Sequence, residues 1–319
     1  MAEILVEARG LTKIFPLTTG WTRRVQVSAV TEVSLALHAG ETLGLVGESG
    51  CGKSTLGRLL LALLPPTTGE IWFAGRNILT LSRPELRHLR RQMQIVFQDP
   101  YFSLNPRMTI RQILEEPYII HGLGSKRERR DWVAGLLHDV GLPEEALHRY
   151  PHEFSGGQRQ RLGIARALAL KPRLIIADEP VSALDVSVQA QVLNLFNDLK
   201  GRMGLTYLFI SHDLSVISHV SDRIAVMYLG RLVEVAPRQR FSQRGLHPYT
   251  EALLDAVPVA DPAYRRPVPR LQGDPPSPVH IPPGCPFHPR CPEALEICRE
   301  VVPEFRPLAA DHWLSCHRR

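Results

Sequence analysis

The chain has 319 residues, of which 44% are hydrophobic and 22% are charged, and its formal net charge is +6. This composition is typical of a globular chain of one large or two smaller domains. No apolar run is long enough to span a bilayer, and the first residues carry Glu3 and Glu7 in place of a signal-peptide core, so we expect a cytosolic protein or one attached to a membrane through partners. The positive net charge is compatible with binding to nucleic acid or to an anionic membrane surface. No basic stripe interleaved with aromatic residues is present, so we expect no nucleic-acid partner.

The first forty residues predict two strands. Residues 11–15 end the first of them, and a polar loop around 18–20 follows. In 32–37, valine and leucine alternate with polar or small residues, which is the period of a half-exposed antiparallel strand.

A glycine-rich stretch follows the next predicted strand. Residues 41–46 predict a short buried strand, and 56–64 predict a helix stopped by Pro65 and Pro66. Between them stand Gly47, Glu48, Ser49, Gly50, Cys51, Gly52, Lys53, Ser54 and Thr55. A strand, a glycine-rich turn and a helix together form the context of a phosphate-binding loop, in which backbone N–H groups and the helix N-terminus face the phosphates. We expect Lys53 to reach the β- and γ-phosphates of a nucleotide and the Ser54 hydroxyl to bind Mg²⁺.

The middle of the chain is predicted to be mostly helical. Strands are expected at 69–75 and at 94–97, the second ending in Gln98, and helices over much of 104–165. Within that region one helix is predicted to present Trp132, Leu136, Leu137 and Val140 on one face. The charge run 126–131 is its solvated start, and the turn 141–143 ends it.

The later part of the chain alternates strands and helices. Residues 174–177 and 207–210 predict short buried strands separated by a helix over 188–200, which indicates a parallel sheet covered by helices. Residues 224–228 and 232–235 predict a closing hairpin. After about residue 240 the chain becomes rich in proline and is expected to be irregular, apart from a short helix over 247–256.

Two carboxylates end the strand at 174–177. Asp178 and Glu179 would lie at the carboxyl edge of a parallel sheet, where such sheets bind ligands. We expect Asp178 to hold Mg²⁺ through water and Glu179 to act as general base toward the attacking water.

A third motif lies between these two sites. Phe154 precedes Ser155, Gly156, Gly157 and Gln158, which stand at the start of a predicted helix. This run resembles the signature motif of ABC-transporter ATPases, which in that family binds the γ-phosphate of an ATP held by the opposite subunit. A serine hydroxyl, two glycines and a helix N-terminus suit an anion.

Other positions match the same family. The resemblance implies that Gln98 is the Q-loop glutamine that contacts Mg²⁺ and senses the membrane domain. It implies that Asp185 belongs to the D-loop at the dimer interface, that His212 is the switch histidine on the γ-phosphate, and that Phe15 stacks on adenine.

The resemblance also implies a fold. It predicts an α/β cassette with a RecA-like mixed sheet, an N-terminal antiparallel β part and a helical signature subdomain. The cassette would occupy residues 1–240, with the helical subdomain at about 99–165, and a C-terminal extension rich in proline and cysteine would occupy 241–319.

The extension narrows the family. Residues 97–107, 247–250 and 284–292 are similar to those of the oligopeptide, dipeptide and nickel importer ATPases. Four cysteines lie in this part of the chain: Cys285, Cys291, Cys298 and Cys316. In a cytosolic chain such a group favours a metal over disulfides. Some of the similar ATPases carry a [4Fe–4S] cluster here, so we favour that cluster over zinc, and zinc over free thiols.

These features together predict an ATP-hydrolysing subunit of a membrane importer that moves oligopeptides or dipeptides. Two cassettes would close head to tail around two ATPs, and the expected partners are two membrane-spanning permeases, a second ABC ATPase and an extracytoplasmic solute-binding protein. The expected location is the cytoplasmic face of the inner membrane. Nickel or another small solute remains an alternative cargo, and a soluble ATPase acting on ribosomes or DNA is a less favoured alternative.

Overall fold

The computed structural model describes residues 3–19, 23–243, 246–257 and 273–319. Its contacts divide the chain into two compact units. The first unit is mainly Thr80–Phe209, with two short N-terminal segments. The second unit consists of Ile4–Leu37, Thr42–Leu79 and Ile210–Arg319.

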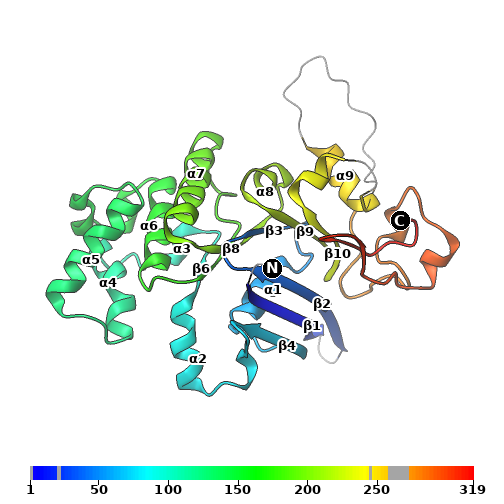
Figure 1. Cartoon of the computed structure of the whole chain (residues 1–319), viewed down its shortest axis with the longest axis horizontal. Coiled ribbons are helices and arrows are strands. Elements are labelled where there is room, and N and C mark those ends of the chain that lie inside the picture. Colours follow the sequence, from blue (N-terminus) through cyan, green and yellow to red (C-terminus); the bar gives the residue numbers. More distant parts are fainter. Residues whose placement is uncertain (1–2, 20–22, 244–245, 258–272) are drawn as a thin grey trace, which may run out of the picture. The chain divides into compact units, whose positions relative to one another are not determined.

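The first unit contains three strands and the helices around them (Figure 1). Its elements are α2 (Arg83–Leu89), β6 (Met93–Val96), α3 (Pro100–Ser103), α4 (Ile110–Ile120), α5 (Lys126–Asp139), α6 (Gly156–Leu168), β7 (Leu174–Asp178), α7 (Val186–Met203) and β8 (Thr206–Ser211). Strands β6 and β7 pair in parallel, with Val96 opposite Ala177, and β8 is the next neighbour of β7. All five residues of β7 are buried, as a parallel strand covered on both faces requires.

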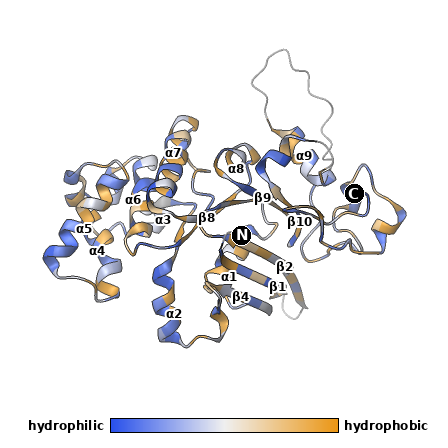
Figure 2. Ribbon diagram, in the orientation of Figure 1, coloured by the Kyte–Doolittle hydropathy of each residue, from blue (hydrophilic) through white to orange (hydrophobic). Residues whose placement is uncertain are grey.

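The helices of the first unit begin at sequence-encoded caps. Helix α5 starts at Ser125, whose side chain accepts from the Glu128 N–H while the Glu128 carboxylate accepts from the Ser125 N–H. This capping box satisfies two backbone donors that a helix start otherwise leaves unpaired. The charge run that follows is exposed apart from the half-buried Arg129, and Figure 2 shows it as hydrophilic, so its prediction as the solvated start of a helix is confirmed.

The predicted buried face of α5 needs a correction. Val133, Leu136, Leu137 and Val140 are buried, whereas the side chain of Trp132 is 39% exposed. The buried face of α5 therefore includes Val133 and not Trp132. Trp132 instead packs its ring against Tyr118 of α4, with the ring centroids 5.0 Å apart.

The second unit contains two sheets. One is antiparallel, with the order β2-β1-β4-β5, formed by β1 (Ile4–Thr19), β2 (Arg23–His38), β4 (Thr68–Phe73) and β5 (Arg76–Asn77). The other contains β11-β12-β10-β9-β3 in that order, formed by β3 (Thr42–Val46), β9 (Arg223–Tyr228), β10 (Arg231–Pro237), β11 (Arg306–Ala309) and β12 (His312–Leu314). Helices α1 (Lys53–Leu60), α8 (Leu214–Val220) and α9 (Pro248–Ala256) complete the unit.

Most predicted strands of the second unit are confirmed. Val33, Leu35 and Leu37 of β2 are buried, as their alternation predicts, and β9 and β10 form the expected antiparallel hairpin. Among the boundaries that differ, β1 continues to Thr19, through the polar residues expected to form a loop, and α1 ends at Leu60. The early end of α1 has a local cause, because Ala62 adopts a left-handed backbone with φ of 50°.

The C-terminal extension contains two strands that were not predicted. Strand β12 pairs antiparallel with β10, with Glu234 opposite Leu314, and β11 pairs with β12. The predicted helix at 247–256 is confirmed as α9. The described part of the chain contains no helix with the length and apolarity needed to cross a membrane.

Candidate nucleotide site

The glycine-rich stretch joins β3 to α1 in the second unit, as predicted. Gly52 has a left-handed φ of 107°, and a Cβ atom there would lie 2.0 Å from the carbonyl oxygen of Ala29. No other residue fits that position without moving the backbone. The close wrap that this glycine permits leads directly into the first turn of α1, and a helix N-terminus after a glycine-rich turn suits a phosphate group.

Lys53 lies inside this turn. Its side chain is buried, and its ammonium donates to the carbonyl oxygens of Gly47 at 2.7 Å and Glu48 at 3.0 Å. An ammonium group that is fixed by carbonyl oxygens beside a helix N-terminus can bind anionic oxygens. Cys51 is buried in the same turn, and burial is the main cause of the raised pKa of its thiol.

Two other residues of the second unit that are predicted to contact the nucleotide, Phe15 and His212, are less buried than Lys53. Phe15 of β1 is half-buried, and the Lys13 ammonium lies 5.1 Å from the centre of its ring. His212 directly follows β8 and is exposed.

The first unit brings together three other predicted residues at the end of β7. Asp178 is the last residue of the strand and is buried, and Glu179 follows it half-exposed. The Gln98 side-chain amide donates to the Glu179 carboxylate at 3.3 Å. The chain is strained at this point, because Glu179 has a left-handed φ of 48°. A non-glycine residue in that region costs about 1–3 kcal/mol, and such strain is found most often at functional sites.

The predicted signature motif begins α6. Ser155 and Gln158 form a capping box, in which the Ser155 hydroxyl accepts from the Gln158 N–H at 3.3 Å and the Gln158 amide oxygen accepts from the Ser155 N–H at 3.0 Å. Ser155, Gly156 and Gln158 are nevertheless exposed. Gly157 is buried, and a Cβ there would lie 2.3 Å from Val188 of α7, so glycine permits the close approach of these helices.

The predicted D-loop residue Asp185 stands just before α7 and is exposed. Its neighbour Val186 is 82% exposed. A Cβ on Gly156 would lie 3.4 Å from Leu184, so the signature motif and the D-loop lie side by side within the first unit. This surface combines a helix N-terminus, small residues and an exposed valine.

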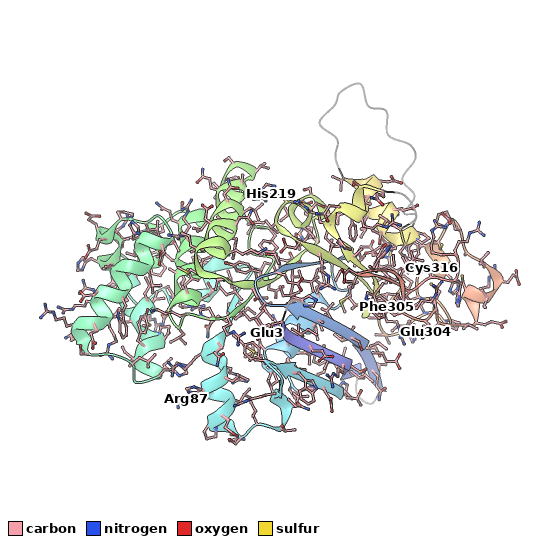
Figure 3. All side chains as sticks on the ribbon, viewed as in Figure 1. Glu3, Arg87, His219, Glu304, Phe305 and Cys316 are labelled. Atoms are coloured by element: carbon pink, nitrogen blue, oxygen red, sulfur yellow. The ribbon has the colours of Figure 1, made fainter. Side chains whose placement is uncertain are left out.

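The four cysteines of the extension lie close enough to influence one another electrostatically, and Figure 3 labels Cys316 among them. Burial, with a smaller effect of the neighbouring cysteines, raises the pKa of Cys285 to about 11. Burial also raises the pKa values of Cys291 and Cys316.

In the part of the chain that the structure describes, no three His, Cys, Asp or Glu residues are grouped to hold a metal ion. The expected iron–sulfur or zinc centre therefore has no support in this arrangement of side chains.

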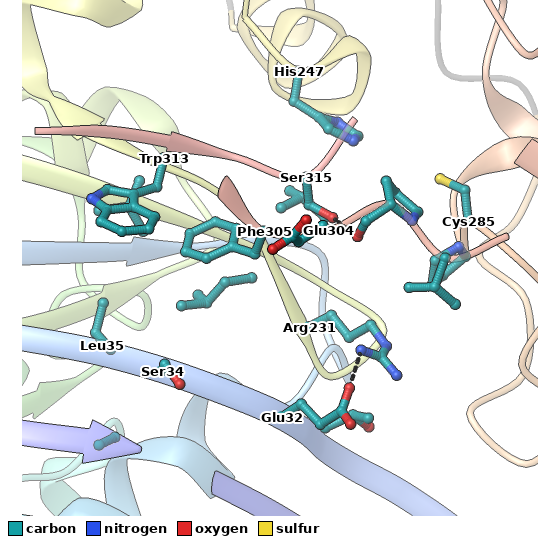
Figure 4. Close-up of a pocket in the computed structure, with 18 of the residues that line it drawn as sticks. Glu32, Ser34, Leu35, Arg231, His247, Cys285, Glu304, Phe305, Trp313 and Ser315 are labelled. Atoms are coloured by element: carbon teal, nitrogen blue, oxygen red, sulfur yellow. Dashed lines mark hydrogen bonds and ion pairs between the residues drawn. The ribbon is translucent and has the colours of Figure 1, made fainter. Parts of the chain in front are cut away.

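A separate pocket of about 780 Å³ lies in the second unit (Figure 4). It is lined by residues of β2, β10 and the extension, among them Cys285, Phe305 and Trp313, and the ion pair between Glu32 and Arg231 lies on its wall. No residue of the glycine-rich turn lines it. Pocket size therefore does not indicate the nucleotide site in this structure.

Comparisons with known proteins agree with these motifs. A family model described as ABC transporter matches residues 30–182, and one described as oligopeptide/dipeptide transporter, C-terminal region, matches 233–298. The chain is 54% identical to a probable peptide ABC transporter ATP-binding protein of Sinorhizobium fredii, over 100% of this chain and 91% of the relative. It is 54% identical to the oligopeptide transport ATP-binding protein AppF of Bacillus subtilis, over 99% of this chain and 97% of the relative.

Solved structures are similar as well. An ATP-binding cassette in a dimeric post-hydrolysis state with ADP and Pi matches with a TM-score of 0.65 and 31% identity, over 73% of this chain and 99% of that one. CbiO1 of Clostridium perfringens, part of an ABC transporter complex, matches with a TM-score of 0.66 and 25% identity, over 76% of this chain and 92% of that one. The chain therefore belongs to the family of ABC-transporter ATPases, which use ATP with Mg²⁺.

Proposed function

We propose that this chain is the ATP-hydrolysing subunit of an importer of oligopeptides or dipeptides. The ATPase part of the proposal follows from the family, and the cargo is inferred from relatives whose names refer to peptide transport and from the match of the extension. In this proposal the extension at 241–319 is a second functional region beside a cassette at 1–240.

The proposed chemistry assigns a role to each motif. Lys53 and the N–H groups of the turn hold the phosphates, and Ser54, Gln98 and Asp178 hold Mg²⁺, which offsets the negative charge of the phosphates when bound. Glu179 takes a proton from the attacking water. The observation that carries this assignment is the hydrogen bond from Gln98 to Glu179, since it fixes a half-exposed carboxylate at the end of a buried strand.

We infer that a second cassette completes the site. Ser155, Gly156 and Gln158 are exposed at a helix N-terminus, beside the exposed D-loop, so they are available to an ATP held by another subunit. His212, which is also exposed, would contact the γ-phosphate, and Phe15 would stack on adenine. The second cassette is either identical or a homologous ATPase.

The proposed assembly lies at the cytoplasmic face of the inner membrane. Two permease subunits would form the pore, and an extracytoplasmic binding protein would deliver the solute. Uptake of labelled dipeptides, oligopeptides and Ni²⁺ by cells with and without the gene tests the cargo. Loss of Ni²⁺ uptake with unchanged peptide uptake would refute the peptide assignment.

The Glu179→Gln variant tests the hydrolytic assignment. We expect its ATPase turnover to fall by about two orders of magnitude or more, because a positioned general base contributes that much, while ATP still binds. Asp198→Asn is the matched control, since Asp198 is an exposed carboxylate on α7 in the same unit. Hydrolysis at the control rate in the Glu179 variant would exclude the general-base role.

A further inference from the structure

Two motifs of the C-terminal extension have no role in the function proposed above. One is His247 to Thr250, at the start of α9, and the other is the stretch from Gly284 to Pro292. Both lie in the second unit, and both supply a side chain that bonds to one residue of the glycine-rich turn, Glu48. The separation along the chain is 201 residues in one case and 242 in the other.

The second motif reaches Glu48 through Arg290. Its Nη1 and Nη2 atoms donate to Oε2 and Oε1 of Glu48 at 2.8 and 3.0 Å. This two-bond geometry fixes the direction of both side chains as well as their separation. The Arg290 side chain is 6% exposed and that of Glu48 is 24% exposed, so the pair is largely shielded from solvent. The hydrogen bonds to Glu48 are the main cause of the raised pKa of Arg290.

The first motif reaches the backbone of the same residue. The Glu48 N–H donates to the hydroxyl oxygen of Tyr249 at 3.0 Å. Tyr249 is fully buried, and burial is the main cause of its raised pKa, so it remains a neutral phenol. Its ring packs against Tyr228 and Phe287, with centroid separations of 4.7 and 5.3 Å. The tyrosine is therefore held rigidly where it meets the turn.

These contacts act on the turn that would hold the phosphates in the proposed function. Lys53 holds the carbonyl oxygens of Gly47 and Glu48 from inside the turn, while Arg290 and Tyr249 hold Glu48 from outside. With its N–H committed to Tyr249 and its carboxylate committed to Arg290, Glu48 has one fixed orientation. A binding loop that is already held in its bound shape loses less entropy when the ligand binds.

We propose that Arg290 is a positioning residue of the nucleotide site, which acts through Glu48 to hold the turn in its ATP-binding shape, and that Tyr249 supports the same residue. The inference rests on the proposed function, because it assumes that the turn binds ATP. It gives the extension a part in nucleotide binding. By linkage, bound ATP must then stabilise the extension against local opening.

The test compares ATP binding by the full-length protein and its Arg290→Ala, Glu48→Gln, double and Arg299→Ala variants. Arg299 is an exposed arginine of the same extension, which makes its removal a matched control. We expect Arg290→Ala and Glu48→Gln each to weaken binding of Mg-ATP by about 3- to 30-fold, because a loop that is only partly populated in its competent shape binds in proportion to that population. The double variant should bind about as weakly as the worse single variant, since both remove one interaction.

Kinetics separate positioning from a general loss of structure. The KM for ATP should rise, while kcat at saturating ATP should change by less than about threefold, because the reacting residues are untouched. Arg290→Lys should restore binding only in part, since an ammonium cannot form the two-bond contact.

Two results would overturn the inference. One is equal ATP affinity in Arg290→Ala and the Arg299→Ala control, and the other is full additivity in the double variant. If Arg290→Ala does not fold, Glu48→Gln alone decides, because it keeps the size of the side chain. Failure of the unaltered protein to bind ATP at all would instead refute the proposed function.

Discussion

The side-chain amide of Gln98 lies 3.3 Å from the Glu179 carboxylate and donates a hydrogen bond to it. The register of the sheet explains why they meet. Strands β6 and β7 run parallel with Val96 opposite Ala177, and each of the two residues lies two positions beyond that pair. The ends of two neighbouring strands thus place an amide and a carboxylate side by side. In the proposed function these two groups would contact the terminal phosphate of the nucleotide and the attacking water.

Removing the Gln98 amide should slow hydrolysis more than it weakens binding. In Gln98→Ala the Glu179 carboxylate loses this donor, so we expect kcat to fall about tenfold or more through less exact orientation of the carboxylate. The affinity for ATP measured without Mg²⁺ should change by less than about threefold, since the turn that carries Lys53 is intact. Steady-state ATPase assays together with direct ATP titration measure both quantities.

Gln94→Ala is the control for that experiment. Gln94 lies in the same strand, and its amide bonds to the carbonyl oxygen of Arg90. A fall in kcat of the same size in both variants would mean that the strand, and not the contact with Glu179, is responsible.

Ser155 has two separable roles. Its hydroxyl caps α6, so Ser155→Ala should lower stability by about 1 kcal/mol. In the proposed dimer the same hydroxyl meets the ATP of a second cassette, so the variant should also fail to form an ATP-dependent dimer while still binding ATP as a monomer. Size-exclusion chromatography with ATP, in a background that does not hydrolyse it, shows the difference.

The matching variant is Ser125→Ala. Ser125 forms the same kind of capping box at the start of α5, so its removal costs a similar cap but leaves the signature motif intact. Dimer formation should survive there. Loss of the dimer in both variants would attribute the effect to helix stability, and loss of monomer binding in Ser155→Ala would contradict a role in trans.

His247 should make stability depend on pH. Burial lowers the pKa of this fully buried imidazole to about 3, from an ordinary value of 6.5, with a smaller contribution from Arg319. Between pH 6.5 and 3 this imidazole is therefore protonated in the unfolded chain and neutral in the folded chain. Stability is fully present above pH 6.5 and is lost as the pH falls below it, by up to about 1.4 kcal/mol for each pH unit.

Urea unfolding at pH 7.5 and pH 5 measures this slope. In His247→Asn, which keeps an acceptor for the cap of α9, the loss on acidification should be smaller. His280→Asn removes an exposed histidine of the same unit and should leave the slope unchanged. A wild-type slope in the His247 variant would show that other groups control the acid sensitivity.

Much of the fold follows from local patterns in the sequence. The buried strands β3, β7 and β8, the hairpin of β9 and β10 and the helix α9 are confirmed because each is marked by a continuous or alternating apolar run between turn residues. The burial pattern of β2 follows from its alternation for the same reason.

The features that were missed lack such a signal. Strand β12 has three residues and β11 has four, one of them Pro307, so neither shows a period. Trp132 and Val133 are adjacent, and period alone could not show that the larger ring stays partly exposed against Tyr118.

The site was predictable only in part. The motifs predict roles for Lys53, Glu179 and Ser155 from their neighbours in sequence, and these roles stay predictions. The bond from Arg290 to Glu48 joins residues 242 positions apart, and nothing in either local sequence points to the other. For the cysteines the sequence predicted too much. Their number suggested a metal site that the arrangement of side chains does not support in the described residues.

The pairing of β12 with β10 has a consequence for the solubility of the chain. An uncovered β10 would present a row of unpaired N–H and C=O groups on a buried, apolar strand, which is a template for aggregation. The extension covers this row and replaces it as the outermost strand with β11, whose four residues are all exposed and include a proline that cannot donate. The strands over 306–314 thus keep one copy of the sheet from extending into the next.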